Sequence, residues 1–280
     1  MRDIHVERIK DAVARLCMEA NYDISPDIHN AFCRALPCEK DALSRDVLEK
    51  LLENAAIAAE QRIPICQDTG MAVIFLEVGQ EVHITGGSLT DAVNAGVAKG
   101  YEEGYLRKSV VADPIRRDNT RDNTPAVIHT AIVPGDRLVI TVSPKGFGSE
   151  NMSALSMLKP SQGLEGIKDF VIETVRKAGP NPCPPIIVGV GVGGTMEKAA
   201  VMAKEALLRD VGTVHGDPFW ADVEQELLQK INSLGIGPGG FGGKSTALAV
   251  HINVFATHIA GLPIAVNIGC HVTRHKTIII

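Results

Sequence analysis

Four glycine-rich or turn-rich segments interrupt the regular pattern of this 280-residue chain. They are residues 66–70 (CQDTG), 145–151 (KGFGSEN), 189–195 (GVGVGGT) and 235–246 (GIGPGGFGGKST). Glycine lets the backbone approach a ligand closely, and it leaves N–H groups free to surround an anion. The chain must therefore fold around several tight loops, and these loops are the first candidates for chemistry.

The stretches between these loops change from helical to extended patterns along the chain. Apolar residues recur at helical spacing within residues 1–62, and Ser25-Pro26 is typical of a helix start. From Met71 to Val78 apolar and β-branched residues predict a strand. Further strands are expected at 126–133, 137–142, 185–192, 244–254 and 263–268, and further helices at 88–101, 166–177, 196–209 and 217–233.

This order of elements predicts an α+β (mixed α/β) fold. A helical N-terminal portion over 1–62 leads into a mixed sheet flanked by helices over 63–280. At this length we expect the whole range 1–280 to form one domain. The helix predicted at 217–233 starts with Asp217 as its cap and Pro218 in its first turn.

Charge and hydropathy indicate which kinds of partner the chain is not expected to bind. The net charge is −5, from 28 basic and 33 acidic residues, and no basic block occurs, so we expect no nucleic-acid partner. No run of about 18 apolar residues is present, so we expect no membrane span. The first residues are charged and lack an apolar signal segment, which favours a cytoplasmic location.

Six cysteines are present, and they fall into two groups. Cys66, Cys183 and Cys270 lie in turns beside predicted strands, whereas Cys17, Cys33 and Cys38 follow helical patterns and are expected to be core residues. No CxxC-type pair occurs, which favours unreactive cysteines throughout. Three separated thiolates can also hold three irons of a [4Fe–4S] cluster and leave the fourth iron open. From the residues alone both interpretations stay open.

Two glycine motifs indicate nucleotide or phosphate binding. Gly189, Gly191 and Gly194 match the GxGxxG spacing after an apolar strand, so a nucleotide-binding oxidoreductase is an alternative of a different class. The match lies late in the chain, and no clean βαβ unit follows it. Gly243-Lys244-Ser245 resembles part of a phosphate loop, but Pro238 occupies the place of the first glycine. This second motif therefore fails.

Seven motifs occur in a fixed order and together resemble one family. They are residues 63–70 (IPICQDTG), 121–129 (RDNTPAVIH), 145–153 (KGFGSENMS), 181–185 (NPCPP), 189–195 (GVGVGGT), 215–220 (HGDPFW) and 235–250. The chain closely resembles class I, iron–sulfur-dependent fumarate hydratases and the related L(+)-tartrate dehydratases. The resemblance extends from about residue 5 to residue 275.

The resemblance implies an enzyme, a hydro-lyase, with a partner chain. The sequence matches the N-terminal, cluster-carrying portion of the family and ends at Ile280, so we expect the α subunit of a hetero-oligomer with a separate β subunit. Two α and two β chains are typical of the family. The implied reaction is reversible hydration of fumarate to L-malate. The alternatives are dehydration of L(+)-tartrate to oxaloacetate and a non-catalytic assembly subunit.

The resemblance also assigns the cofactor. Family members hold a [4Fe–4S] cluster through three cysteines, and the matching positions are Cys66, Cys183 and Cys270. The open iron is then expected to act as a Lewis acid on the hydroxyl that leaves as water.

Five further residues are implied at the site of the small dicarboxylate substrate. Gln67 and Asp68 are expected beside the cluster and the substrate, and Asp68 is also assigned a catalytic role. Arg107 is expected to bind a carboxylate, although it also fits a solvated helix end. Gly148 is expected to offer its backbone N–H, unless it is only a turn glycine. His258 is expected to support proton transfer, unless it is a core histidine, and the base itself is expected on the β chain.

Overall fold

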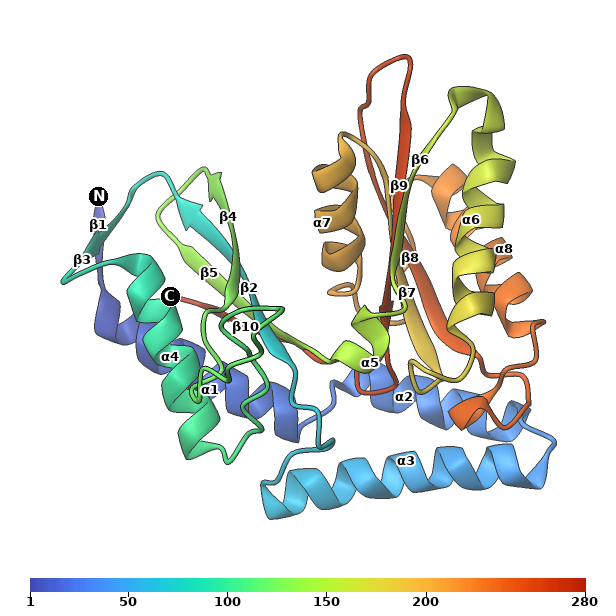
Figure 1. Cartoon of the computed structure of the whole chain (residues 1–280), viewed down its shortest axis with the longest axis horizontal. Coiled ribbons are helices and arrows are strands. Elements are labelled where there is room, and N and C mark those ends of the chain that lie inside the picture. The colour runs from blue at the N-terminus through green and yellow to red at the C-terminus, as the bar shows by residue number, and fades with distance from the viewer. The chain divides into compact units, whose positions relative to one another are not determined.

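The computed structural model describes residues 1–280, and they form two compact units that interleave along the chain (Figure 1). Unit 1 contains Met1–Ser25, Asn54–Phe147 and Arg274–Ile280, and unit 2 contains Pro26–Glu53 and Gly148–Thr273. Helices and mixed sheets occur in both units, which confirms the predicted α+β class. The single domain over 1–280 stays a prediction, because two compact units can belong to one domain.

Unit 1 is built on a four-stranded sheet with the order β10-β5-β2-β4. Its elements are β1 (Arg2–His5), α1 (Val6–Tyr22), β2 (Met71–Gly79), β3 (Val82–Thr85), α4 (Leu89–Glu103), β4 (Val127–Val133), β5 (Leu138–Lys145) and β10 (Lys276–Ile279). The helices α1 and α4 lie side by side against this sheet (Figure 1). Apolar residues at helical spacing in α1, such as Ile9 and Val13, pack on Ile74 and Ile140 of the sheet.

The strand order in unit 1 does not follow the chain. β4 and β5 are joined by a short turn at Pro134-Gly135-Asp136, yet they do not pair with each other. β2 lies between them, parallel to β4 and antiparallel to β5. This arrangement brings the start of β2, and the loop that precedes it, to the end of β5 at Lys145.

Unit 2 is built on a second four-stranded sheet, with the order β6-β9-β7-β8. Its strands are β6 (Ala154–Leu158), β7 (Ile186–Gly193), β8 (Ala247–Phe255) and β9 (Leu262–Gly269), and its helices include α2 (Pro26–Ala35), α6 (Gly163–Ala178), α7 (Met196–Ala206) and α8 (Pro218–Asn232). α7 covers one face of the sheet, and α6 and α8 cover the other (Figure 1).

Several short elements complete the chain. The boundary between the units falls inside α3 (Ala42–Gln61) and again inside the one-turn helix α5 (Phe147–Glu150). Three short 3₁₀ helices are η1 (Leu36–Cys38), η2 (Pro160–Gln162) and η3 (Pro238–Gly240). No helix combines the length and the apolar character that a membrane span requires.

The GxGxxG match has a packing explanation. A Cβ atom on Gly189 would lie 2.1 Å from the carbonyl oxygen of Ala203, and one on Gly191 would lie 2.1 Å from that of Ala199. Both carbonyls belong to α7, which therefore lies directly on the β7 backbone, and every residue of β7 is buried. The space above these two glycines is filled by the chain's own helix, so they serve close packing of a helix on a strand.

The predicted cysteine burial is wrong for two residues. Cys17 is buried in the core of unit 1, as expected, but Cys33 and Cys38 are exposed. α2 buries Ile28 and Phe32, and Cys33 lies outside that stripe, whereas Cys38 lies on η1. Helical spacing identified the helix correctly, but it did not identify which face is buried.

Candidate functional site

The CQDTG loop in unit 1 is held by side chains that donate to its carbonyl groups. Tyr101 donates to the carbonyl oxygens of Thr69 (2.8 Å) and Gly70 (2.9 Å). The amide of Asn123 also donates to Gly70 (3.2 Å), and Arg274 donates through Nη2 to the carbonyl of Asp68. Three successive carbonyl groups are therefore bonded by donors of unit 1, which fixes the backbone beside Cys66.

The same contacts place Arg107 next to this loop. The Thr69 hydroxyl donates to the carbonyl oxygen of Arg107 at 3.0 Å. Asn123 is fully buried, and its Oδ1 accepts the N–H groups of Ser109 (2.7 Å) and Val110 (3.2 Å). Asn123 also adopts a φ of 63°, which asparagine tolerates better than most residues. The Arg107 backbone is thus tied to the loop while its side chain is exposed.

Asp68 connects this loop to the KGF segment. Its Oδ1 accepts the N–H of Gly70 (3.0 Å), and its Oδ2 accepts the N–H of Phe147 (2.9 Å). A Cβ on Gly146 would lie 3.2 Å from Oδ2, so this close approach favours glycine there. In this structure the Asp68 carboxylate holds the backbone of Gly70 and Phe147 in place. The neighbouring Gln67 is exposed.

Cys183 and Cys270 lie in one hydrogen-bonded corner of unit 2. The N–H of His271 donates to the carbonyl oxygen of Cys183 at 3.2 Å. The N–H and hydroxyl of Thr273 donate to the carbonyl oxygen of Cys270 at 2.9 and 2.7 Å. Cys183 has a φ of 54°, a conformation that is uncommon outside glycine and is typical of functional loops. Neither cysteine forms a disulfide; Cys183 is exposed and Cys270 half-buried.

The segment that contains Gly148 is anchored within unit 2. Glu150 forms an ion pair with Lys204, and its Oε2 accepts the side-chain N–H of Asn267 at 2.9 Å. Asn267 lies on β9, which ends just before Cys270. Gly148 itself is exposed, and a Cβ there would lie 3.7 Å from the carbonyl oxygen of Asn181, two residues before Cys183. Gly148 therefore approaches the Cys183 loop within unit 2.

The donor chemistry of the three cysteines fits an iron–sulfur cluster in part. Cys66, Cys183 and Cys270 all lie in loops without a disulfide, and none is fully buried. Cys183 and Cys270 are neighbours in unit 2, while Cys66 belongs to unit 1. The structure gathers no group of three metal-ligating side chains. Unit 2 thus brings the backbones of Cys183 and Cys270 close together, and unit 1 holds Cys66 beside a loop whose carbonyls are hydrogen-bonded.

Unit 2 does not bring His258 close to Cys270. His258 is exposed in the turn between β8 and β9, and its Nδ1 accepts the N–H of Ala260 at 3.2 Å. Cys270 follows the opposite end of β9, whose eight residues span about 26 Å at roughly 3.3 Å per residue. The role of His258 in proton transfer stays a prediction.

The GKS motif is occupied by the chain's own carboxylate. Glu39 is buried, and its two carboxylate oxygens accept the backbone N–H of Lys244, each at 3.0 Å. One of them also accepts the N–H of Ser245 at 2.6 Å. Glu39 therefore takes the place that a phosphate would fill, which confirms that the motif is not a phosphate loop.

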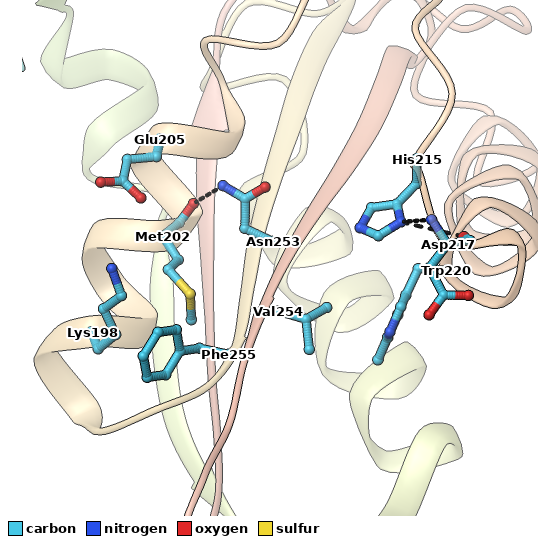
Figure 2. Close-up of a pocket in the computed structure, with 9 residues that line it drawn as sticks. All are labelled: Lys198, Met202, Glu205, His215, Asp217, Trp220, Asn253, Val254 and Phe255. Carbon is cyan, nitrogen blue, oxygen red and sulfur yellow. Dashed lines mark hydrogen bonds between the residues drawn. The ribbon is translucent and has the colours of Figure 1, made fainter. Parts of the chain in front are cut away.

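A pocket of about 520 Å³ opens elsewhere in unit 2, between α7, the start of α8 and the end of β8 (Figure 2). His215 accepts the N–H of Asp217 at 2.9 Å, and Asp217 caps α8 by accepting the N–H of Phe219 at 2.9 Å. The predicted helix start is therefore confirmed. The pocket contains none of the residues that the resemblance assigns to the substrate.

Comparison with known proteins identifies the family. Residues 10–279 match the family described as "Fumarate hydratase (Fumerase)". The chain belongs to this family. The protein is accordingly an enzyme of the hydro-lyase class, as the seven motifs predicted.

Relatives of this fumarate hydratase family member carry a subunit name. A protein of Methanocaldococcus jannaschii named "Putative L(+)-tartrate dehydratase subunit alpha" is 44% identical over 273 residues, which cover 95% of each chain. Proteins of Escherichia coli and Shigella sonnei named "L(+)-tartrate dehydratase subunit alpha" are 30% identical over 278 residues, 98% of this chain and 91% of theirs. The printed names describe these relatives as α subunits, which implies a partner subunit for them.

The sequence analysis missed the residues that hold the loops. Tyr101, Asn123 and Arg274 in unit 1, and Lys204 and Asn267 in unit 2, were not predicted. Asn123 belongs to the RDNTP motif, and Arg274 follows Cys270 by four residues. Their positions in or near a motif were the only sequence signal that could have pointed to these two residues. Their contacts join distant parts of the chain, which no local pattern reveals.

Proposed function

We propose that this chain is the α subunit of a [4Fe–4S]-dependent hydro-lyase that reversibly hydrates fumarate to L-malate together with a separate β subunit. The observation that carries the proposal is the corner in which His271 bonds Cys183 directly beside Cys270, in a chain of the fumarate hydratase family. The proposed cluster ligands are Cys66, Cys183 and Cys270.

The proposed cofactor has a defined chemical task. A [4Fe–4S] cluster bound by three thiolates supplies one iron with an open position, which is a Lewis acid for the hydroxyl that leaves as water. The chain's own contribution is to fix the thiolates. The hydrogen bonds on the carbonyls of Cys183, Cys270 and Asp68 hold the backbone on which these side chains stand.

Substrate binding is assigned to exposed groups beside the loop of Cys66 and beside the loop of Cys183. L-Malate and fumarate are dianions, so each carboxylate needs donors or a cation. Arg107 offers an exposed guanidinium on a backbone that is tied to Thr69. Gln67 offers a side-chain amide, and Gly148 offers a backbone N–H. These groups orient the substrate so that the C2 hydroxyl is held for departure.

The reaction also requires a base. In the dehydration direction the C3–H proton passes to the base, and the electron pair of that bond forms the double bond while the C2 hydroxyl leaves as hydroxide. The proton taken from C3 and this hydroxide together make up the water that is released. We assign this base to the β subunit. The Asp68 carboxylate accepts two backbone N–H groups, so its role here is to hold the KGF segment against the CQDTG loop. His258 lies at the opposite end of β9 from Cys270, so it is given no part in this step.

Dehydration of L(+)-tartrate to oxaloacetate is the second candidate. The names of the relatives favour it, because each of them carries the name of a tartrate dehydratase α subunit. Tartrate differs from malate by one additional hydroxyl group, and the chemistry at the leaving hydroxyl is the same. We assign discrimination between the two substrates to groups that include the β subunit.

We further propose an assembly of two α and two β chains in a reducing compartment, the cytoplasm. None of the six cysteines forms a disulfide, and cluster thiolates must stay reduced.

The decisive experiment is anaerobic purification of the α and β chains together, followed by iron and sulfide analysis. We expect about four irons per α chain. Cys183→Ser should lower the iron content sharply, whereas Cys33→Ser is the matched control, because Cys33 is an exposed cysteine of α2. Wild-type protein without iron after reconstitution, or equal loss in both variants, would contradict the proposal.

The same preparation decides the substrate. Initial rates on fumarate, L-malate and L(+)-tartrate should be compared for one α–β pair at saturating concentrations. A kcat/KM that is higher for fumarate and malate supports the first candidate, and a higher value for tartrate supports the second. Activity on none of them by an iron-loaded pair would contradict both.

A further inference from the structure

A buried cation that no carboxylate bonds lies beside the CQDTG loop. The side chain of Arg274 is only 4% exposed. Its Nη2 donates to the neutral carbonyl of Asp68, while Nε and Nη1 are buried and have no hydrogen-bond partner. No carboxylate therefore bonds this guanidinium. A buried guanidinium with two nitrogens that lack a hydrogen-bond partner is costly, so an anion is expected to face Arg274 in the working protein.

Arg274 differs from the other donors that hold the loop. Tyr101 and Asn123 are neutral, and they bond the carbonyls of Thr69 and Gly70. The Asp68 carboxylate is the nearest acidic group along the loop, but it is engaged by the backbone N–H groups of Gly70 and Phe147. Burial raises the pKa of Tyr101, and the nearby Arg274 charge acts against that rise, so the field of this charge reaches the loop interior.

The position of Arg274 along the chain links it to two of the proposed cluster ligands. It follows Cys270 by four residues, and it bonds the carbonyl of the residue two positions after Cys66. A second contact fixes its own backbone, because the Ser143 hydroxyl donates to the Arg274 carbonyl at 3.4 Å. Within unit 1, Arg274 is thereby attached to β5 and to the loop of Cys66.

We propose that Arg274 is a positioning residue that holds the Cys66 loop and compensates the negative charge of the thiolate-bound cluster. This inference rests on the proposed function. A resident anion fits better than the substrate, because the free nitrogens are inaccessible to solvent and a substrate that enters and leaves would expose them in every cycle. Three thiolates give a bound [4Fe–4S] centre a net negative charge, and reduction makes it more negative. A fixed cation nearby therefore raises its reduction potential.

The test uses the reconstituted α–β complex with Arg274→Lys, Arg274→Gln and the control Arg137→Gln. Arg137 is an exposed arginine of unit 1 in the turn before β5. Two quantities are measured on the loaded complex: the cluster reduction potential, by redox titration with spectroscopic detection, and the rate of iron release to a chelator. Hydrogen exchange of the amides of residues 66–70 is measured on the protein without iron.

The expected outcomes separate charge from packing. Arg274→Gln should lower the reduction potential and release iron about tenfold to a hundredfold faster, a range typical for loss of a residue that supports metal ligands. Arg274→Lys should keep a potential near that of the wild type, because it keeps the charge, and Arg137→Gln should change neither quantity. Equal potentials in the Lys and Gln variants would overturn the charge role, even if both release iron faster.

Hydrogen exchange keeps this inference distinct from the proposed function. Faster exchange of the Gly70 amide in Arg274→Gln without iron supports the role of Arg274 in holding the loop, and unchanged exchange overturns it. If the wild-type complex takes up no iron, the proposed function fails and the charge role fails with it, while the exchange result still decides the structural part. A thermal unfolding curve for each variant shows that the fold is intact.

Discussion

The backbone N–H of His271 donates to the carbonyl oxygen of Cys183 at 3.2 Å, and the imidazole Nδ1 of His271 lies 3.0 Å from the same oxygen. One residue thus binds the Cys183 loop twice, directly after Cys270 in the sequence. The φ of 54° at Cys183 makes this support necessary, because a non-glycine residue holds that conformation only when its surroundings fix it.

His271→Ala should weaken cluster binding. It removes the side-chain contact to the Cys183 carbonyl but keeps the backbone bond, so we expect iron affinity to fall about tenfold or more. The measurement is iron retained against a competing chelator in the α–β complex. His29→Ala is the control, because His29 is exposed on α2. Equal retention in both variants would show that the imidazole does not support the loop.

Asn123→Ala should destabilise unit 1 by about 3 kcal/mol. The substitution leaves the N–H groups of Ser109 and Val110 without their partner and removes one of the two donors to the carbonyl of Gly70, and a buried polar group left without a partner costs roughly 1–3 kcal/mol. Urea unfolding followed by circular dichroism measures the change. The exposed Asn30→Ala should change stability by less than about 0.5 kcal/mol. A similar effect in the two variants would contradict the role of Asn123.

Arg107→Met should raise KM for the dicarboxylate about tenfold to a hundredfold, because an exposed guanidinium that binds a carboxylate is lost. Arg107→Lys should recover part of the loss, since lysine keeps the charge without the paired N–H groups. Steady-state kinetics of the loaded complex separate KM from kcat. Arg116→Met, another exposed arginine of unit 1, should leave both unchanged, and a wild-type KM in Arg107→Met would refute the assignment.

The stability of unit 2 should fall as the pH drops below about 6.5. Burial lowers the pKa of His251 from its ordinary value of 6.5, and the Arg209 charge lowers it further. The unfolded chain therefore binds a proton before the folded chain does, so acidification favours unfolding, with a limiting slope of about 1.4 kcal/mol per pH unit for one group. Above the unfolded pKa both states are neutral, and this penalty disappears.

Comparison with a variant isolates the histidine. Unfolding free energies of the wild type and His251→Gln should be measured by urea titration at several pH values between 5 and 8. The difference between the two proteins should grow in favour of the variant as the pH falls below 6.5. A difference that does not depend on pH would show that His251 is not the group responsible.

Local patterns were sufficient for the longer elements. The strand expected from Met71 to Val78 forms as Met71–Gly79, and the helix expected over 217–233 begins at Pro218 with Asp217 as its cap. The four-residue strands β1, β3 and β10, together with β6, were missed. Each is stabilised by a partner far away in the sequence, as when Lys276–Ile279 pairs with Val139–Val142 of β5.

The candidate site residues were predicted from seven motifs that occur in a fixed order, because no single residue was sufficient to identify the site. Cys183 and Cys270 were selected from turns that are 87 residues apart, and the structure places them in one corner. The GxGxxG match was equally visible, yet Gly189 and Gly191 serve the packing of α7. A glycine motif reports only that a close approach occurs. It does not tell whether a ligand or another part of the chain makes that approach.

By itself, the sequence determined the α+β class, the main helices and strands, and the family, because periodicity, caps and ordered motifs are local properties of the chain. Only the tertiary structure decided the rest. It showed that Glu39 fills the GKS loop, that Cys33 is exposed, and that Tyr101, Asn123 and Arg274 hold the loop beside Cys66. Hydrogen bonds and burial in these cases join residues far apart along the chain, and which residues meet depends on how the sheets and helices pack.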